Sequence, residues 1–339
     1  MGRIDSLGMW DAVLGLPEQL DVALTSLARG VHGLPGAEDY EHVVFVATGG
    51  SGVAAQVACA AAGPESPVPL LICNDYELPG YVGPRSLVVA VSFSGATAET
   101  VDVAQAAHEA GAHVITISNG GPLAKLAAQW GSTHVAVPDS LPQPRAAVGA
   151  LVAPMVLVLD ELGLYPTGLA DLNEAVDQLR RRAGALGRKQ NTAIDLAHAI
   201  GTTLPLVYGG GPIGTVAAQR WKSQMNLSAK MPAFFNHLPA LAHDEIAGWA
   251  QHGDVTRQVF TLVLLRHDHE HPQVSASFEA LDSMLLECVA GIETVQAEGD
   301  GALAQLFDLM LVGDVVSLEL AAIAGVDPGP VPAVAALRG

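Results

Sequence analysis

Short apolar strands that end in turns of small residues recur along this sequence, and they constrain its fold more than any other feature. The apolar run 42–47 is followed by the turn Thr48-Gly-Gly-Ser-Gly52 and then by an alanine-rich helical stretch. The run 86–92 breaks in the same way at Phe93-Ser-Gly-Ala-Thr97, again before a helical stretch. Continuous Val, Ile and Leu runs that alternate with helices are typical of a parallel sheet covered on both faces.

The same arrangement returns about 160 residues further on, which indicates an internal repeat. The segment Pro205-Leu-Val-Tyr-Gly-Gly-Gly-Pro-Ile-Gly214 again has the pattern of a strand, a glycine turn and a helix. The apolar run 260–265 then corresponds to the run 86–92. Three further strands are expected in the first half, at 68–73, 113–118 and 133–137. We therefore predict an α/β chain of two tandem doubly wound domains, each a parallel sheet flanked by helices.

The predicted boundaries follow from these elements. Residues 1–155 comprise an N-terminal amphipathic helix, from Asp11 to about Gly30, and the first domain. Residues 156–190 form a helical connection. Residues 191–339 form the second domain, which ends in a helix over 303–324 and a short tail.

Composition excludes several classes of partner. The chain has 339 residues, of which 50% are hydrophobic and 15% charged, so it has enough apolar surface to bury two cores. With 16 Lys and Arg against 35 Asp and Glu, its net charge is −19. This charge repels nucleic acids and anionic membranes, and neither is expected as a partner.

The same composition favours a cytoplasmic location. No run approaches the roughly 18 apolar residues of a membrane span, and charges interrupt the N-terminal segment where a signal peptide would be apolar. The three cysteines show no CxxC spacing, which argues against a disulfide framework or a zinc ribbon. Cys59 and Cys288 are expected to act as small hydrophobic residues.

An acidic protein that binds an anion needs a local site that overcomes its own field, and the turn after the run 86–92 offers one. It opens a helix, whose first N–H groups lack intrahelical partners and lie at the positive end of the dipole. The hydroxyls of Ser92, Ser94, Thr97 and Thr100 add donors. We predict a phosphate site here, over the alternative of ordinary helix capping. The turn 48–52 lies at the same edge of the sheet, where open α/β sheets bind ligands.

Two other patterns are not expected to bind cofactors. Gly209-x-Gly211-x-x-Gly214 matches the dinucleotide fingerprint, but Lys230 stands about 20 residues later, where that fingerprint needs an acid at the end of a second strand. His267, His269 and His271 alternate as metal ligands on a strand would, yet they follow a buried strand and end at a proline, which indicates an exposed loop. We expect neither a metal site nor a cofactor.

The stretch 220–245 concentrates cations and proton-transfer groups. It holds Arg220, Lys222, Lys230, His237, His243, Asp244 and Glu245. A general acid or base beside cations suits proton transfer on an anionic substrate.

Taken with the turns, this stretch resembles the bifunctional phosphoglucose/phosphomannose isomerase family, whose members contain two sugar isomerase (SIS) domains. The motifs occur in family order and span nearly the whole chain. They are Gly49-Gly-Ser-Gly52, Ser92-Phe-Ser-Gly-Ala-Thr97 with Glu99-Thr100, Pro144-Arg-Ala-Ala-Val-Gly149, Arg220-x-Lys-x-Gln-x-Asn226 with Ala229-Lys230, His243-x-Glu-Ile246 and Val326-Asp-Pro-x-Pro330.

The resemblance implies roles for individual residues. Ser51, Ser92, Ser94 and Thr97 would bind a sugar phosphate, with Gly50 and Thr100 in the same two turns. Arg145 would face the substrate and stabilise an enediolate, a use that suits a positioned guanidinium. His243 would open the pyranose ring, and because this histidine reaches the site from the neighbouring subunit in the family, a homodimer is implied.

Two positions depart from the family pattern. The motif that carries the catalytic glutamate reads Asn226-Leu227-Ser228-Ala229-Lys230 here, and leucine cannot exchange a proton. Near the C-terminus Arg338 replaces a lysine that assists ring opening, and arginine is a poor proton donor.

Two hypotheses follow from these departures. The first is an aldose–ketose isomerase acting on glucose 6-phosphate or mannose 6-phosphate, and the second is a non-catalytic protein that binds phosphosugars. An enzyme acting on another phosphosugar lies between them. Asp244 and Glu245 are the nearest carboxylates by sequence that could replace the missing base, although Glu245 fits a structural role in the histidine motif better.

Overall fold

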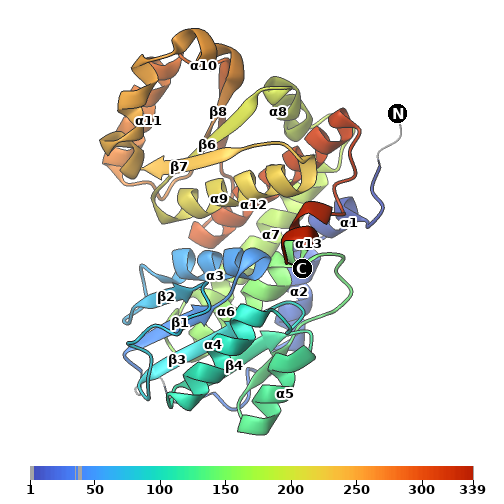
Figure 1. Ribbon diagram of the computed structural model, residues 1–339, viewed down its shortest axis with the longest axis vertical. Coiled ribbons are helices and arrows are strands. Elements are labelled where there is room, and N and C mark those ends of the chain that lie inside the picture. Colours follow the sequence, from blue (N-terminus) through green and yellow to red (C-terminus); the bar gives the residue numbers. More distant parts are fainter. Residues whose placement is uncertain (1–3, 35, 37–39, 339) are drawn as a thin grey trace. The chain divides into compact units, whose positions relative to one another are not determined.

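The computed structural model describes residues 4–34, 36 and 40–338. The chain divides into two compact units, each built around one parallel sheet (Figure 1). The N-terminal unit comprises residues 16–176, and the C-terminal unit comprises residues 1–15 together with 177–339.

The sheet of the N-terminal unit has five parallel strands in the order β2-β1-β3-β4-β5. All the strands expected in this half of the sequence are present. They are β1 (His42–Val46), β2 (Leu70–Cys73), β3 (Ser86–Val91), β4 (His113–Ser118) and β5 (His134–Ala136). Every residue of β3 is buried, as the continuous apolar run requires of a central strand.

Helices cover both faces of this sheet (Figure 1). On one face, α4 (Ala98–Glu109) and α5 (Gly121–Trp130) supply buried side chains to a core that includes alternate residues of β1 and β3 and one residue of β4. On the other face, α3 (Gly49–Ala62) packs against α6 (Val148–Glu161), and α2 (Leu16–Ser26) packs on α6. Helix α6 is buried from Val148 to Leu159, so it lies inside this core.

The sheet of the C-terminal unit repeats this topology. Its four parallel strands have the order β7-β6-β8-β9, the same order as β2-β1-β3-β4. The strands are β6 (Leu204–Gly210), β7 (Phe234–Leu238), β8 (Phe260–Arg266) and β9 (Gly291–Gln296). Strand β8 thus holds the position of β3, as the repeat predicts. The prediction of two tandem doubly wound domains is confirmed.

Helices also cover both faces of the second sheet (Figure 1). Helix α9 (Gly211–Gln224) packs on β6 and β7, and α12 (Ala302–Ala324) packs on α9 and on α8 (Thr192–Ile200). The opposite face is covered by α11 (Pro272–Leu285), whose buried side chains join those of β6 and β8 in one core. The remaining helices are α1 (Met9–Leu14), α7 (Gly168–Leu186), α10 (Gly253–Val259) and α13 (Pro332–Arg338).

One local expectation differs from the structure, and two strands were not expected. The N-terminal helix is two helices, α1 and α2, separated at Gly15. Pro17 stands in the first turn of α2, where its missing N–H group is tolerated, whereas a continuous helix would lose a hydrogen bond there. Strands β7 and β9 were not expected, because both lie at sheet edges and neither has the continuous apolar pattern of a buried strand.

Helix α12 fixes the core of the C-terminal unit. Its side chains are buried on all sides from Leu303 to Ala321. The indole of Trp221, on α9, donates a hydrogen bond of 2.7 Å to the carbonyl of Leu309 and lies against Gly313. A helix this apolar belongs to a protein core here, and no helix in the described part of the chain is long and apolar enough to cross a membrane.

Replacement of glycine by alanine should change the free energy of unfolding in opposite directions at Gly313 and at Gly184. A Cβ atom at Gly313 would lie 2.3 Å from Nε1 of the rigid, buried Trp221, whereas nothing lies within 4 Å of one at Gly184, in the exposed face of α7. We expect Gly313→Ala to lower the free energy of unfolding by about 1–3 kcal/mol through overpacking. Gly184→Ala should raise it by about 0.5–1 kcal/mol, because alanine restricts the unfolded chain more than glycine.

Urea unfolding followed by circular dichroism measures both variants. Equal midpoints for Gly313→Ala and the wild type would contradict the close packing of α9 against α12.

Candidate active site

Two turns meet at the carboxyl edge of the sheet in the N-terminal unit. Strands β1 and β3 are parallel neighbours, with Val46 opposite Ala90, so the chain leaves both strands at the same edge. The backbone N–H of Phe93 donates a hydrogen bond of 3.3 Å to Oγ of Ser51. This bond joins the turn 48–52 to the turn 92–97, which the sequence placed at one edge.

The turn 92–97 is held by its own hydroxyls. Oγ of Ser92 and Oγ1 of Thr97 form a hydrogen bond of 2.8 Å, and Oγ of Ser94 accepts one of 3.3 Å from the N–H of Ala96. The Thr97 side chain does not cap α4, which begins at Ala98. First-turn N–H groups without a side-chain cap, beside exposed Ser94, are a suitable cradle for an anion.

Thr100 is as deeply buried as Ser92 of the turn 92–97. Its side chain is 1% exposed, and within the described residues its Oγ1 has no hydrogen-bond partner. It therefore lies beneath the turn rather than on its surface.

A third segment approaches the same turns and carries Arg145. This residue belongs to the short 3-10 helix η2 (Pro144–Ala146) and is buried, with 7% of its surface exposed. A Cβ atom at Gly50 would lie 3.0 Å from the backbone N of Arg145 and from the Pro144 carbonyl. The absence of a side chain at Gly50 therefore lets the Arg145 segment lie directly against the start of α3. Segments 49–52, 92–97 and 144–146 come together in one place.

His243 belongs to the C-terminal unit. It ends the 3-10 helix η4 (Ala240–His243), which follows β7, and its side chain is exposed, as is that of Asp244. Oδ1 of Asp244 accepts a hydrogen bond of 2.5 Å from the N–H of Glu245, the first residue of the 3-10 helix η5 (Glu245–Ala250).

The Glu245 carboxylate is held by two donors. The Tyr208 hydroxyl donates to Oε1, and Nδ2 of Asn236 donates to Oε2 at 2.6 Å. Both oxygens of Glu245 accept hydrogen bonds from neighbouring side chains. This favours a structural role for Glu245 over a role as the replacement base. Tyr208 and Asn236 were not identified as site residues from the sequence. Asn236 lay within the singled-out stretch 220–245, whereas nothing in the pattern distinguished Tyr208 from other strand residues.

The segment that carries Leu227 has an unusual backbone. Residues Met225–Ala229 form a π-helical turn, η3, and Leu227 is half-buried in it. Lys230 follows with a positive φ of 57°, and its Nζ donates hydrogen bonds to the carbonyls of Leu227 at 2.5 Å and Pro330 at 2.6 Å. Arg338 is the last residue of α13, and its side chain lies outside the described part of the chain.

The cations of the stretch 220–245 are less available than their number suggests. Arg220 is buried, and its guanidinium pairs with Asp314 of α12 at 2.9 Å and 2.5 Å. Lys230 bridges two carbonyl groups. Both side chains thus stabilise the C-terminal unit.

The glycine and histidine patterns also have structural roles. Gly209 and Gly214 touch, since a Cβ atom at Gly209 would lie 1.9 Å from the carbonyl oxygen of Gly214, so these glycines let α9 pack on β6. His267 is buried and donates from Nε2 to the carbonyl of Gly210 at 2.9 Å, which differs from the exposed loop that the sequence predicts. His271 caps α11.

The described residues contain no group of three or more His, Cys, Asp or Glu side chains that could hold a metal ion. Burial raises the pKa of the Cys59 thiol to about 12, so this thiol stays protonated.

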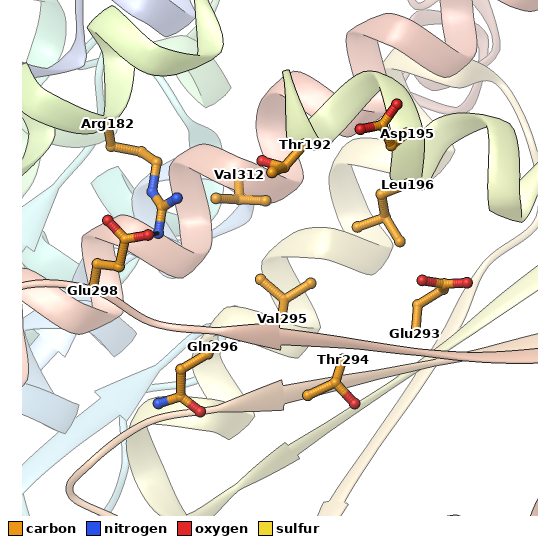
Figure 2. A pocket seen from close by; sticks show the side chains of 10 residues that line it. All are labelled: Arg182, Thr192, Asp195, Leu196, Glu293, Thr294, Val295, Gln296, Glu298 and Val312. Atoms are coloured by element: carbon orange, nitrogen blue, oxygen red, sulfur yellow. Dashed lines mark ion pairs between the residues drawn. The ribbon is translucent and has the colours of Figure 1, made fainter. Parts of the chain in front are cut away.

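Figure 2 shows a pocket of about 340 Å³ in the C-terminal unit, lined by residues of α8, β9 and α12. Its cation, Arg182, pairs with Glu298 at 3.0 Å and with Asp308 at 2.7 Å. The carboxylates of Asp195 and Glu293 also line it. This charge disfavours a phosphate, and none of the sequence-predicted site residues lines the pocket.

Comparisons with known proteins agree with this architecture. Residues 38–158 match the family model described as SIS domain, and residues 189–339 match the one described as bacterial phospho-glucose isomerase C-terminal SIS domain. Among solved structures, the C-terminal domain of glucosamine-fructose-6-phosphate aminotransferase from Francisella tularensis superposes with a TM-score of 0.72 at 14% identity. This superposition covers 95% of this chain and 97% of that chain.

Two curated relatives carry the same name, bifunctional phosphoglucose/phosphomannose isomerase. The protein from Caldicellulosiruptor bescii is 32% identical over 327 residues, which cover 95% of this chain and 96% of that protein. The protein from Aquifex aeolicus is 30% identical over 293 residues, which cover 86% and 88%. The chain therefore belongs to the bifunctional phosphoglucose/phosphomannose isomerase family.

Proposed function

We propose that this protein is an aldose–ketose isomerase that interconverts glucose 6-phosphate or mannose 6-phosphate with fructose 6-phosphate. The observation that carries the proposal is the meeting of three segments in the N-terminal unit. The Ser51 hydroxyl bonds to the turn 92–97, and Gly50 lies against the backbone of Arg145. Hydroxyls and helix N–H groups next to the segment of a buried arginine suit a phosphosugar, and they do so in a chain of net charge −19.

Each residue has a proposed role in this reaction. Ser51, Ser92, Ser94 and Thr97 hold the phosphate, with Gly50 and Thr100 shaping the two turns. Arg145 stabilises the negative charge of the enediolate. His243 moves a proton at the ring oxygen and is contributed by the neighbouring subunit of a homodimer, with Arg338 assisting through hydrogen bonds. The reaction needs no cofactor, and a cytoplasmic location suits it.

A second function is favoured by Leu227. Proton transfer between C2 and C1 requires a base, and a positioned base typically contributes about 10²–10⁴-fold to the rate. The leucine side chain cannot supply it, and each oxygen of the Glu245 carboxylate accepts a hydrogen bond from a neighbouring side chain. The alternative is therefore a non-catalytic protein that binds phosphosugars and acts as a regulator.

One experiment separates the two functions. Purified protein is incubated with each hexose 6-phosphate in D₂O, and deuterium at C2 and product formation are followed by NMR. Calorimetric titration with fructose 6-phosphate and a five-carbon phospho-acid mimic of the enediolate measures binding. Turnover that is lost in His243→Ala supports the isomerase. Tight binding without exchange at C2 rejects it in favour of the binding protein.

The cradle predicts a binding defect that does not depend on turnover. A hydrogen bond to a charged group contributes about 1.5–3 kcal/mol, so removing two hydroxyls in Ser94→Ala/Thr97→Ala should weaken the affinity for fructose 6-phosphate by at least about 100-fold. Calorimetry measures the Kd. The control is Ser66→Ala, which removes a hydroxyl that bonds to Val68 in a loop of the same unit. Unchanged affinity in the double variant would exclude this turn as the phosphate site.

Restoring an acid at position 227 should increase the rate. We expect Leu227→Glu to raise kcat for hexose 6-phosphate isomerisation by at least about tenfold, because the carboxylate can take the proton from C2. The matched control, Leu227→Gln, has nearly the same shape but cannot act as a base. A coupled assay of both variants measures the difference. Equal rates in the two folded variants would place the missing base elsewhere.

A further inference from the structure

We propose that Tyr208 is a positioning residue for the turn that carries His243. It holds the Glu245 carboxylate, and through it the start of η5, at a fixed place against the sheet. This inference rests on the proposed function for its catalytic consequence, and on contacts within the C-terminal unit for the positioning itself.

The Tyr208 hydroxyl is fixed in place. The residue lies on the central strand β6, where its backbone pairs on both sides, opposite Asn236 of β7 and Leu264 of β8. Its side chain is fully buried. Burial and the neighbouring Glu245 carboxylate raise the pKa of the hydroxyl, which therefore keeps its proton and donates. The indole N–H of Trp249 donates to the same hydroxyl oxygen at 3.3 Å.

Asn236 provides the second contact with the carboxylate. Its Oδ1 accepts a hydrogen bond of 2.8 Å from the N–H of His237, which orients the amide so that Nδ2 faces Glu245. Tyr208 on β6 and Asn236 on β7 therefore each donate a hydrogen bond to one oxygen of the Glu245 carboxylate. A carboxylate bonded by two neutral donors is held more strongly than a neutral acceptor in the same place.

Apolar contacts on both sides complete the support. Leu241, before the histidine, is 1% exposed and packs in the core with Tyr208. Ile246 and Trp249, after it, pack against the same core. His243 lies exposed between these anchors. Its backbone is thus constrained while its imidazole stays accessible, as a proton donor supplied to another subunit requires.

The test compares two tyrosines in the same kind of environment. Tyr165, in the N-terminal unit, is also 1% exposed, and its hydroxyl also donates to a carboxylate, that of Asp171, at 2.5 Å. Tyr208→Phe and Tyr165→Phe each remove one buried hydroxyl. Deuterium exchange of backbone amides, followed by mass spectrometry, should accelerate over residues 240–250 in Tyr208→Phe. It should remain at the wild-type rate there in Tyr165→Phe.

Kinetics show whether positioning affects ring opening. We expect Tyr208→Phe to lower kcat on glucose 6-phosphate by about ten- to a hundredfold with little change in KM, because a misplaced proton donor affects the reaction more than binding. 5-Deoxyglucose 6-phosphate cannot close a pyranose ring and so needs no ring opening. Tyr208→Phe should convert this analogue at the rate of the wild-type protein. Equal losses on both substrates, or wild-type exchange over residues 240–250, would overturn the proposal.

Swapping the amide of Asn236 and the carboxylate of Glu245 tests their contact in a chain that keeps Tyr208. Asn236→Asp places two carboxylates together and should accelerate exchange over residues 240–250. The double variant Asn236→Asp/Glu245→Gln restores an amide–carboxylate pair and should return the exchange to the wild-type rate. Failure of this rescue overturns the proposal. If the wild-type protein turns over no sugar phosphate, the proposed function fails, whereas the exchange results still decide the positioning role.

Discussion

Parallel strand pairing determines where both units of this protein can place polar groups. In the N-terminal unit the register of β1 with β3 brings the ends of both strands to one edge, where the turns 48–52 and 92–97 share a hydrogen bond. In the C-terminal unit the register of β6 with β7 sets Gly210 opposite Leu238, so the His243 turn begins at the corresponding edge. The repeat thus provides the same edge twice. One copy carries hydroxyls and helix N–H groups, and the other carries the histidine turn.

The sequence predicts those parts of the fold that depend on burial alone. Central strands such as β3 appear as continuous apolar runs, because both of their faces are covered. Edge strands are only half-buried, and β9 reads Gly-Ile-Glu-Thr-Val-Gln, a pattern that suits loops equally well. The site is less accessible to this reasoning. Arg145 was identified only through a family resemblance, and Tyr208 carried no signal, because a contact between a strand and a distant turn leaves no periodic pattern.

The distribution of charge shows why counting cations along the sequence overestimates the capacity to bind anions. Arg220 forms a buried ion pair with Asp314, and Arg182 forms one with Asp308. Removing one member of such a pair leaves an unpaired buried charge, so both arginines are tied to the fold. In a chain with 35 acidic residues, an anion site then depends mainly on neutral donors. A helix N-terminus with nearby hydroxyls supplies these donors without a lysine or arginine side chain.

The π-helical turn at Met225–Ala229 shows that the local backbone does not depend on a glutamate at position 227. Nδ2 of Asn226 donates to the carbonyl of Met231 at 2.9 Å, which secures the turn from within. Nζ of Lys230 links it to Pro330, just before the helix that ends at Arg338. None of these contacts involves the Leu227 side chain. The side chain at position 227 can therefore change without loss of the contacts that secure this turn.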